Sequence, residues 1–399
     1  MRSLKPKDFP GRALAPALPR MLLIAALALL SLALLSCQPR QEERELRIGL
    51  LIPLSNTPDR FIAHRALEQM LARVNAAGGV ETPAGRVRVR LLVEDTGNQI
   101  ERMMNAVNRL IQVERVAAIV GPYYSREAVP AGAAAEAAQV AMITPTASNP
   151  AVTRGRAFVF RACLVDTDQA QVMASCALKD MGLGVGAVLF DAGDAYSRDL
   201  AETFRTLYAS LGGRVALFEG YPPETRDFAA TMAKLKASGA KFLFLPNFSQ
   251  ALKTQMIQAR AVGFAGVFLG VDSWDEDRSL QALPEAQGAL FAADFFPGGL
   301  SEKARSELES YAAVLGEPMD KNSVLTLDSM GLLLSAASRA RSLSPADLRD
   351  ALAGTRNFEG LTGRISFDPE GDPDRSVHVL RVTQGSTALV KVVGSGQVQ

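Results

Sequence analysis

Six short polar segments hold the side chains of this protein that are best suited to bind a small molecule. They are residues 55–56, 123–125, 144–149, 191–196, 247–249 and 272–275. The first three segments are rich in hydroxyl groups, whereas the last three contribute carboxylates, an amide and aromatic rings. Hydroxyl and backbone N–H groups are able to hold a carboxylate, and a carboxylate with an aromatic ring is able to hold an ammonium group. The two halves of the chain therefore offer complementary groups, with Asp272 as the expected anion.

Each of these segments lies at the end of a predicted strand. Residues 47–54, RIGLLIPL, form an apolar run that is typical of a strand buried on both faces. Apolar residues then recur at helical spacing from Ile62 to Val74, and Gly78 with Gly79 is expected to end that helix. A strand, a helix and a strand with short links predict a parallel sheet covered by helices. Because ligands bind beyond the carboxyl ends of such strands, the six segments are expected to line one cleft.

The same pattern occurs a second time along the chain. Residues 186–191 predict a strand, and a helical face from Leu200 to Leu211 ends at a second glycine pair, 134 residues after the first. We therefore expect an α/β protein with two Rossmann-like lobes, each a parallel sheet flanked by helices. The section after Asp294 is expected to complete both lobes, so that the chain crosses between them more than once.

The expected lobe boundaries follow from this repetition. The first lobe is expected to comprise residues 46–163 and 290–364, and the second lobe residues 164–289 and 365–393. The hinge is expected where the chain crosses between the lobes, near residues 161–166, 286–292 and 363–369.

Individual residues in the polar segments also have simpler structural explanations. Thr144 and Ser148 are able to cap the following helix, although a helix N-terminus also attracts anions. Tyr196 is able to pack on its own helix, and Trp274, the single tryptophan, fits the core or the rim of a site equally well. A binding site is therefore predicted from the six segments together rather than from any one residue.

Residues that would support catalysis are sparse. The two histidines, His64 and His378, share no motif with a nucleophile, and the chain has no G-x-S-x-G, H-E-x-x-H or phosphate-binding loop motif. Candidate metal ligands are not clustered, so we expect neither a metal nor a cofactor. A binding protein is favoured over an enzyme, and a secreted hydrolase that uses Asp191, Asp194 or Asp272 is the least supported alternative.

The N-terminal segment has the features of an export signal. Residues 21–36 are a continuous apolar run, preceded by basic residues and followed by Cys37. The run is shorter than the roughly 20 residues of a membrane span, and the residues before Cys37 resemble a bacterial lipobox. We expect a lipoprotein signal peptide at residues 1–36, lipidation of Cys37 and a polar tether at residues 37–45, with an uncleaved anchor helix as the alternative. Either way we expect the body outside the cytoplasm, on the periplasmic side if the envelope is Gram-negative.

Charge and cysteine content exclude some other classes of function. The first 36 residues hold five basic side chains and one acidic one, while the whole chain of 399 residues has a net charge of +1. The body is thus mildly acidic and offers no electrostatic surface for nucleic acid. Cys163 and Cys176 form no C-x-x-C motif, so neither a redox motif nor a thiolate zinc site is indicated. Two buried free thiols are slightly favoured over a disulfide between them.

A series of phrases from about residue 46 to 385 resembles the branched-chain amino-acid (Leu/Ile/Val) binding proteins of ABC transporters. In order, they include IGLLIPLS, VNAAGGV, VEDTGN, AAIVGPYYS, MITPTASNPAVT, LGVDSW and LDSMGLLLSAA. The resemblance implies the type I periplasmic-binding fold, two lobes that close on a ligand like a Venus flytrap, here in a lipoprotein form.

The resemblance also implies which residues bind the ligand. The loop that matches ITPTASNP holds the ligand α-carboxylate in the family, which implies Thr146, Ala147 and Ser148, with Ser125 from the preceding loop. The family's aromatic and acidic residues match Tyr196 and Asp272, the latter as the partner of the α-ammonium group. Four further residues are possible ligand contacts, namely Ser55, Tyr124, Asn247 and Trp274.

Three departures from the family affect the side-chain pocket. The first loop, SNTPDR, is about two residues shorter than usual, Ser197 replaces a glycine after Tyr196, and Leu327 replaces a common tyrosine. Leucine-like specificity is therefore not implied, although an amino acid or a close relative is still favoured. The expected function is an extracytoplasmic solute-binding protein that delivers this ligand to an ABC permease. The alternative is an envelope lipoprotein of the same fold that regulates or activates a cell-wall enzyme.

Overall fold

Two sheets organise the described part of the chain, as the repeated pattern predicts. The computed structural model describes residues 45–55, 62–276 and 278–395. Each sheet has its own helices and its own core, so the expected α/β fold with two lobes is confirmed. The predicted signal peptide at residues 1–36, the lipidation site Cys37 and residues 38–44 of the predicted tether lie outside the described residues.

The first sheet has the order β2-β3-β1-β4-β5-β6. Its strands are β1 (Glu45–Ile52), β2 (Val80–Thr82), β3 (Gly85–Asp95), β4 (Ala118–Val120), β5 (Ala141–Thr144) and β6 (Val159–Arg161). Strand β1 lies in the centre and runs parallel to both β3 and β4, while β2 is antiparallel to β3. The apolar run at residues 47–54 is therefore a central strand, as predicted.

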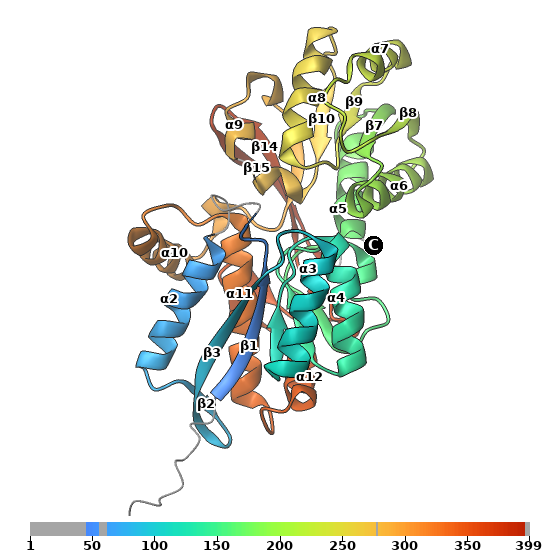
Figure 1. The fold of residues 1–399 in the computed structure, drawn as a ribbon. Coiled ribbons are helices and arrows are strands. Elements are labelled where there is room, and N and C mark those ends of the chain that lie inside the picture. The colour runs from blue at the N-terminus through green and yellow to red at the C-terminus, as the bar shows by residue number, and fades with distance from the viewer. Residues whose placement is uncertain (1–44, 56–61, 277, 396–399) are drawn as a thin grey trace, which may run out of the picture. The chain divides into compact units, whose positions relative to one another are not determined.

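Helices cover both faces of this sheet (Figure 1). They are α2 (Ala63–Ala76), α3 (Ile100–Asn108), α4 (Ser125–Ala138), α10 (Glu302–Leu315), α11 (Lys321–Arg339) and α12 (Pro345–Ala353). Since successive side chains of a strand point to opposite faces, Leu50 packs with α2 and α11, while Leu51 packs with α3 and α4. Helix α2 ends just before Gly78 and Gly79, whose φ angles of +95° and +86° suit glycine, as the sequence predicts.

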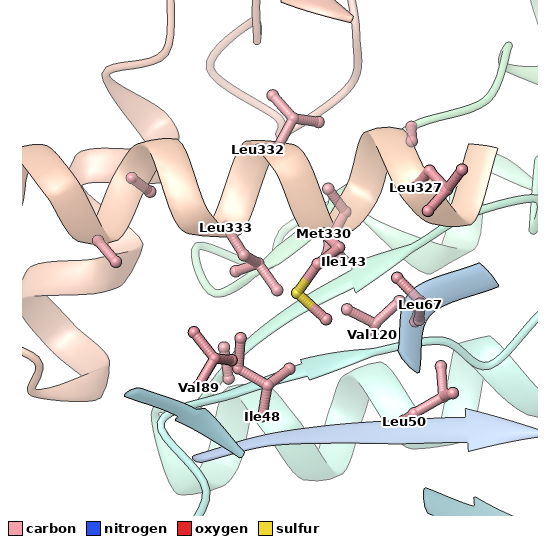
Figure 2. Packing of buried hydrophobic residues seen from close by; sticks show 14 of the residues in the cluster. Ile48, Leu50, Leu67, Val89, Val120, Ile143, Leu327, Met330, Leu332 and Leu333 are labelled. Atoms are coloured by element: carbon pink, nitrogen blue, oxygen red, sulfur yellow. The ribbon is translucent and has the colours of Figure 1, made fainter. Parts of the chain in front are cut away.

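Helix α11 forms much of the first core although it lies far along the sequence. Figure 2 shows its residues Met330 and Leu333 over Ile48, Val89 and Val120 of the sheet. The late helix therefore completes the first lobe, which confirms that the section after Asp294 returns to it.

The second sheet has the order β15-β14-β11-β10-β9-β7-β8. Its strands are β7 (Val185–Asp191), β8 (Arg214–Tyr221), β9 (Phe242–Phe244), β10 (Val267–Gly270), β11 (Leu290–Ala293), β14 (Val377–Thr383) and β15 (Ser386–Val393). Strands β7 to β11 are parallel, and β14 and β15 add an antiparallel edge. Its main helices are α5 (Asp166–Ser175), α6 (Ala195–Ser210), α7 (Ala229–Ser238) and α8 (Ser249–Ala261). Its shorter elements include η4 (Asp272–Glu276) and α9 (Arg278–Gln281), whereas the hairpin of β12 (Phe358–Gly360) with β13 (Gly363–Ile365) packs against the first core.

Three crossings of the chain connect the two lobes. The first follows β6, the second follows β11, and the third lies between β13 and β14. Asp294 accepts a hydrogen bond from the backbone of Leu164, at 2.7 Å. The buried guanidinium of Arg375 donates to the carbonyl oxygens of Ala162 and Asp294. One acidic and one basic side chain thus tie all three crossings together.

Two of the crossings lie later in the chain than expected. Strand β11 pairs with β10 in the second sheet, so residues 290–293 do not belong to the first lobe as expected. Ile365 and Phe367 still pack in the first core, so the third crossing follows them. The sequence places these boundaries too early because a four-residue apolar strand carries no signal for the sheet it joins.

The cysteines and the helices of the described residues were also the subject of expectations from the sequence. Cys163 and Cys176 are both buried and free, as the sequence favoured. In the part of the chain that the structure describes, no helix is long and apolar enough to cross a membrane.

The packing of α11 predicts a large loss of stability when its core contact is truncated. Leu333 is buried, so Leu333→Ala should leave a cavity and lower the free energy of unfolding by about 2–5 kcal/mol. Urea denaturation of the full protein measures this change. Val314→Ala is the matched control, because this side chain is 65% exposed and its truncation should cost less than about 0.5 kcal/mol. A loss below about 1 kcal/mol for Leu333→Ala would contradict the packing described.

Candidate functional site

The first lobe presents two polar loops at the carboxyl ends of β4 and β5. Ser125 is the first residue of α4, and its hydroxyl oxygen accepts a hydrogen bond from the backbone of Asn149 at 3.3 Å. Thr146 donates from its hydroxyl to the carbonyl oxygen of Tyr123 at 2.8 Å. These bonds join the two loops, and Ser125, Thr146 and Ser148 line one cavity.

The second lobe presents an aromatic ring and a carboxylate to the same cavity. Tyr196 lies in the first turn of α6, and its hydroxyl donates to Oδ1 of Asp272 at 3.0 Å. The backbone N–H of Asp272 donates to Oε1 of Gln169 at 2.9 Å, which fixes the loop after β10 against α5. Phe248 completes this wall, with its ring centroid 5.2 Å from that of Tyr196 and 5.8 Å from that of Tyr124.

The cavity between these walls is small in this arrangement. Its volume is about 20 Å³, which is about the room for one water molecule. A solute of amino-acid size therefore requires the two walls to separate before it enters. The lobes also contact each other through Asn149 of the first lobe, whose amide donates to Asp199 of the second at 3.0 Å.

A buried ion pair joins the lobes beside the cavity. Lys321, the first residue of α11, donates from Nζ to Oδ2 and to the carbonyl oxygen of Asp272, each at 2.9 Å. The side chains of Lys321 and Asp272 are only 1% and 4% exposed. Nζ also lies 4.0 Å from Oδ2 of Asp294 at the hinge. The carboxylate expected to meet a ligand is therefore already paired with a cation of the opposite lobe.

Burial shifts the pKa values of two acids near the hinge. Burial raises the pKa of Asp166 to about 8, the Ser148 hydroxyl lowers it in part, and the charge of Asp272 raises it further. Burial also raises the pKa of Asp294, while the ammonium of Lys321 lowers it in part. Asp166 is therefore mostly protonated at neutral pH, and it adds little negative charge near the cavity.

Six of the residues predicted from sequence lie together around the cavity. They are Tyr124, Ser125, Thr146, Ser148, Tyr196 and Asp272. Ala147 is buried behind them, and its backbone N–H donates to Thr144 at 3.2 Å. Sequence reasoning from strand ends thus located residues of both lobes that share one cavity.

Three of the further candidates have structural contacts instead and do not line this cavity. Ser55 hydrogen-bonds to Asp95 within the first lobe. Asn247 is buried and donates to the carbonyl oxygen of Leu189 and to Gln255, at 2.9 and 3.0 Å. Trp274 packs in the second core and donates from its indole to Leu245 at 2.9 Å.

Four residues at the site were not named from the sequence as individual ligand contacts. Tyr123, Phe248 and Ser273 line the cavity, and each lies within one of the six polar segments that the sequence predicts to line a cleft. Lys321 had no comparable signal, because a lysine at the start of a predicted helix is normally exposed to solvent. Among the described residues, no group of three His, Cys, Asp or Glu side chains is placed to hold a metal ion.

Comparison with known families gives a match over most of the chain. The family model described as periplasmic binding protein matches residues 45–387. These residues include both sheets except for most of β15, and all the residues that line the cavity.

Individual relatives agree with the family match. An amino acid binding protein from Pseudomonas aeruginosa is 27% identical over 324 residues, which cover 79% of this chain and 83% of that protein. The Leu/Ile/Val-binding protein homolog 3 of Brucella melitensis is 29% identical over 341 residues, covering 82% and 88%. The crystal structure of a leucine-binding protein from Thermotoga maritima has a TM-score of 0.78 and 28% identity, and the match covers 88% of this chain and 99% of that one.

The buried carboxyl group of Asp166 is expected to make stability depend on pH. It stays protonated in the folded protein up to a pKa of about 8, whereas in the unfolded chain it ionises near pH ~4. Between these two pH values the carboxyl group of Asp166 is protonated in the folded protein but ionised in the unfolded chain. The contribution of this group to the free energy of unfolding therefore falls as pH rises, by at most about 1.4 kcal/mol per pH unit.

Replacing this acid tests its protonation directly. Asp166→Asn should remove that fall in stability when urea denaturation is compared between pH 5 and pH 8. Glu359→Gln is the matched control, because its side chain is 74% exposed and its removal should leave the pH dependence unchanged. An Asp166→Asn protein with the pH dependence of the unmodified protein would show that Asp166 is ionised in the folded state.

Proposed function

Because the chain belongs to the periplasmic binding protein family, we propose that it closes on a small carboxylate-bearing solute and delivers it to an ABC permease. The relatives are named for binding amino acids, among them leucine, isoleucine and valine, which supports an amino acid or a close relative as the solute. The observation that carries the proposal is the single cavity lined by Ser125, Thr146 and Ser148 of one lobe and by Tyr196 and Asp272 of the other. The relatives are solute-binding proteins, which supports the proposal that this protein binds a solute and is not an enzyme.

In this proposal the first lobe holds the carboxylate of the solute. Ser125, Thr146 and Ser148 line one cavity, and Ser125 lies at the N-terminus of α4, a 14-residue helix. Helix N-termini favour anions because their first N–H groups have no partner within the helix. The backbone N–H of Ala147, proposed as a donor from the resemblance, is already bonded to Thr144 and would have to exchange that bond.

The second lobe would complete the enclosure when the lobes close. Tyr196 and Phe248 contribute aromatic rings to the lining of the cavity, and Asp272 contributes a carboxylate. We propose that the lobes move about the three crossings, with the first lobe built on β1 to β6 and the second on β7 to β11, β14 and β15. Only the closed form lets a solute contact both walls, so the solute stabilises that form.

We further propose that the protein works outside the cytoplasm as a lipoprotein. The family is periplasmic, and the sequence offers a signal peptide at residues 1–36 and Cys37 for the lipid. The alternative role as a regulator of a cell-wall enzyme is not favoured, because the relatives described are named as amino-acid-binding proteins.

Solute binding is tested by thermal unfolding with a panel of small carboxylates. A true ligand at about 100 times its Kd should add about 2.7 kcal/mol to the free energy of unfolding and raise Tm. Ser148→Ala should weaken binding by roughly 10- to 150-fold, because one hydrogen bond to a charged group contributes about 1.5–3 kcal/mol. The exposed control Ser338→Ala should bind like the unmodified protein. Equal affinity in Ser148→Ala and the control would remove Ser148 from the site.

Lipid anchoring is tested by replacing the acceptor cysteine. Cys37→Ser should move the protein from the membrane fraction to the soluble extracytoplasmic fraction, because the thiol that takes the lipid is gone. Cys176→Ser is the control, since this cysteine is buried in the second lobe and should not affect partition. Membrane retention of Cys37→Ser would instead support an uncleaved anchor helix.

A further inference from the structure

The charge at the polar end of the cavity is already balanced within the protein. Lys321 of the first lobe contacts Asp272 of the second through two acceptors at 2.9 Å, and both side chains are buried. Tyr196 donates to the remaining carboxylate oxygen of Asp272 at 3.0 Å. The position beside Asp272 that the family resemblance assigns to a ligand ammonium is therefore occupied by the ammonium group of Lys321.

No second carboxylate of the described residues lines the cavity. Asp166 lies next to Ser148 but outside the lining, and burial keeps its pKa near 8, so it is mostly neutral at pH 7. Asp199 is paired with the amide of Asn149 and is 47% exposed. Asp294, whose Oδ2 is 4.0 Å from Lys321 Nζ, lies at the hinge and outside the lining as well. A ligand ammonium would thus enter a buried site beside Lys321 in which the one carboxylate of the lining, Asp272, is already paired.

Electrostatics then discriminates between two classes of solute. A buried cation is strongly unfavourable unless it is paired, and Lys321 would also repel a second cation close to it. A carboxylate meets no such obstacle, because it would face the first lobe, where Ser125, Thr146 and Ser148 line the cavity and Ser125 lies at the N-terminus of α4. The site therefore suits an acid and disfavours the zwitterion of an amino acid.

The rest of the lining favours an apolar, flat body for the solute. Tyr123, Tyr124, Tyr196 and Phe248 all border the cavity, and Phe248 contacts both Tyr124 and Tyr196 through its ring. Aromatic walls bind planar groups by stacking or edge-to-face contact. An acid with an aromatic ring or a conjugated oxo group matches this surface.

Resting on the proposed function, we propose that the solute is an organic monocarboxylate that lacks an α-ammonium group, such as a 2-oxo acid or an aromatic acid. Lys321 is the residue that sets this preference, by occupying Asp272 in place of the ligand.

Matched pairs of compounds test this preference. The full protein, purified in detergent, is titrated calorimetrically with leucine against 4-methyl-2-oxopentanoate and with phenylalanine against phenylpyruvate. At least one acid should bind ten times or more tightly than its amino acid. Lys321→Met frees Asp272 for the ligand and should reverse the ratio, whereas Lys236→Met, at an exposed lysine of α7, should leave it unchanged.

The outcomes separate this inference from the proposed function. Tighter binding of either amino acid by the unmodified protein would overturn the inference and leave the proposed function standing, while no binding of any of the four compounds would count against both. If Lys321→Met does not fold, the Asp272→Asn/Lys321→Met protein replaces it, because it buries no unpaired charge. This double variant should keep the affinity for the acid within about tenfold and should still reject the amino acid. A gain of amino-acid binding in it would also contradict the inference.

Discussion

In a parallel sheet every strand leads into a loop at the same edge, and this constraint positions the candidate site. In the first lobe β4 and β5 bring the residues after Val120 and Thr144 side by side. In the second lobe β9 and β10 do the same for Phe248 and Asp272. Within each lobe, loops that are more than twenty positions apart in the sequence therefore lie at the same edge of the sheet. Hydrogen bonds such as that from Thr146 to Tyr123 then fix the loops.

Much of the fold and part of the site follow from local sequence. The run at residues 47–54 is apolar because both of its faces are covered, and Gly78 and Gly79 end α2 because their φ angles are positive. Such signals lie within a few residues of the feature they determine. This is why the strand ends, and with them Ser148 and Asp272, could be identified from sequence together with the family resemblance.

The remaining features depend on contacts that no local pattern encodes. The sequence shows that Asn247 is polar and follows a strand, but its amide is used by Leu189 and Gln255 rather than by a cavity. Lys321 pairs with a residue 49 positions away in the other lobe. Strand β11 is too short to reveal which sheet it joins. In each case the direction of a side chain or the partner of a strand is decided by the assembled lobes.

The bonds made by Arg375 and Asp294 have a mechanical consequence. Because these two side chains link the three connecting strands, the strands cannot bend one at a time without breaking a buried hydrogen bond. If the lobes rotate against each other as proposed, these bonds favour movement of the three connecting segments together. A transport partner in the membrane would then detect filling of the cavity through the relative position of two stiffly connected lobes.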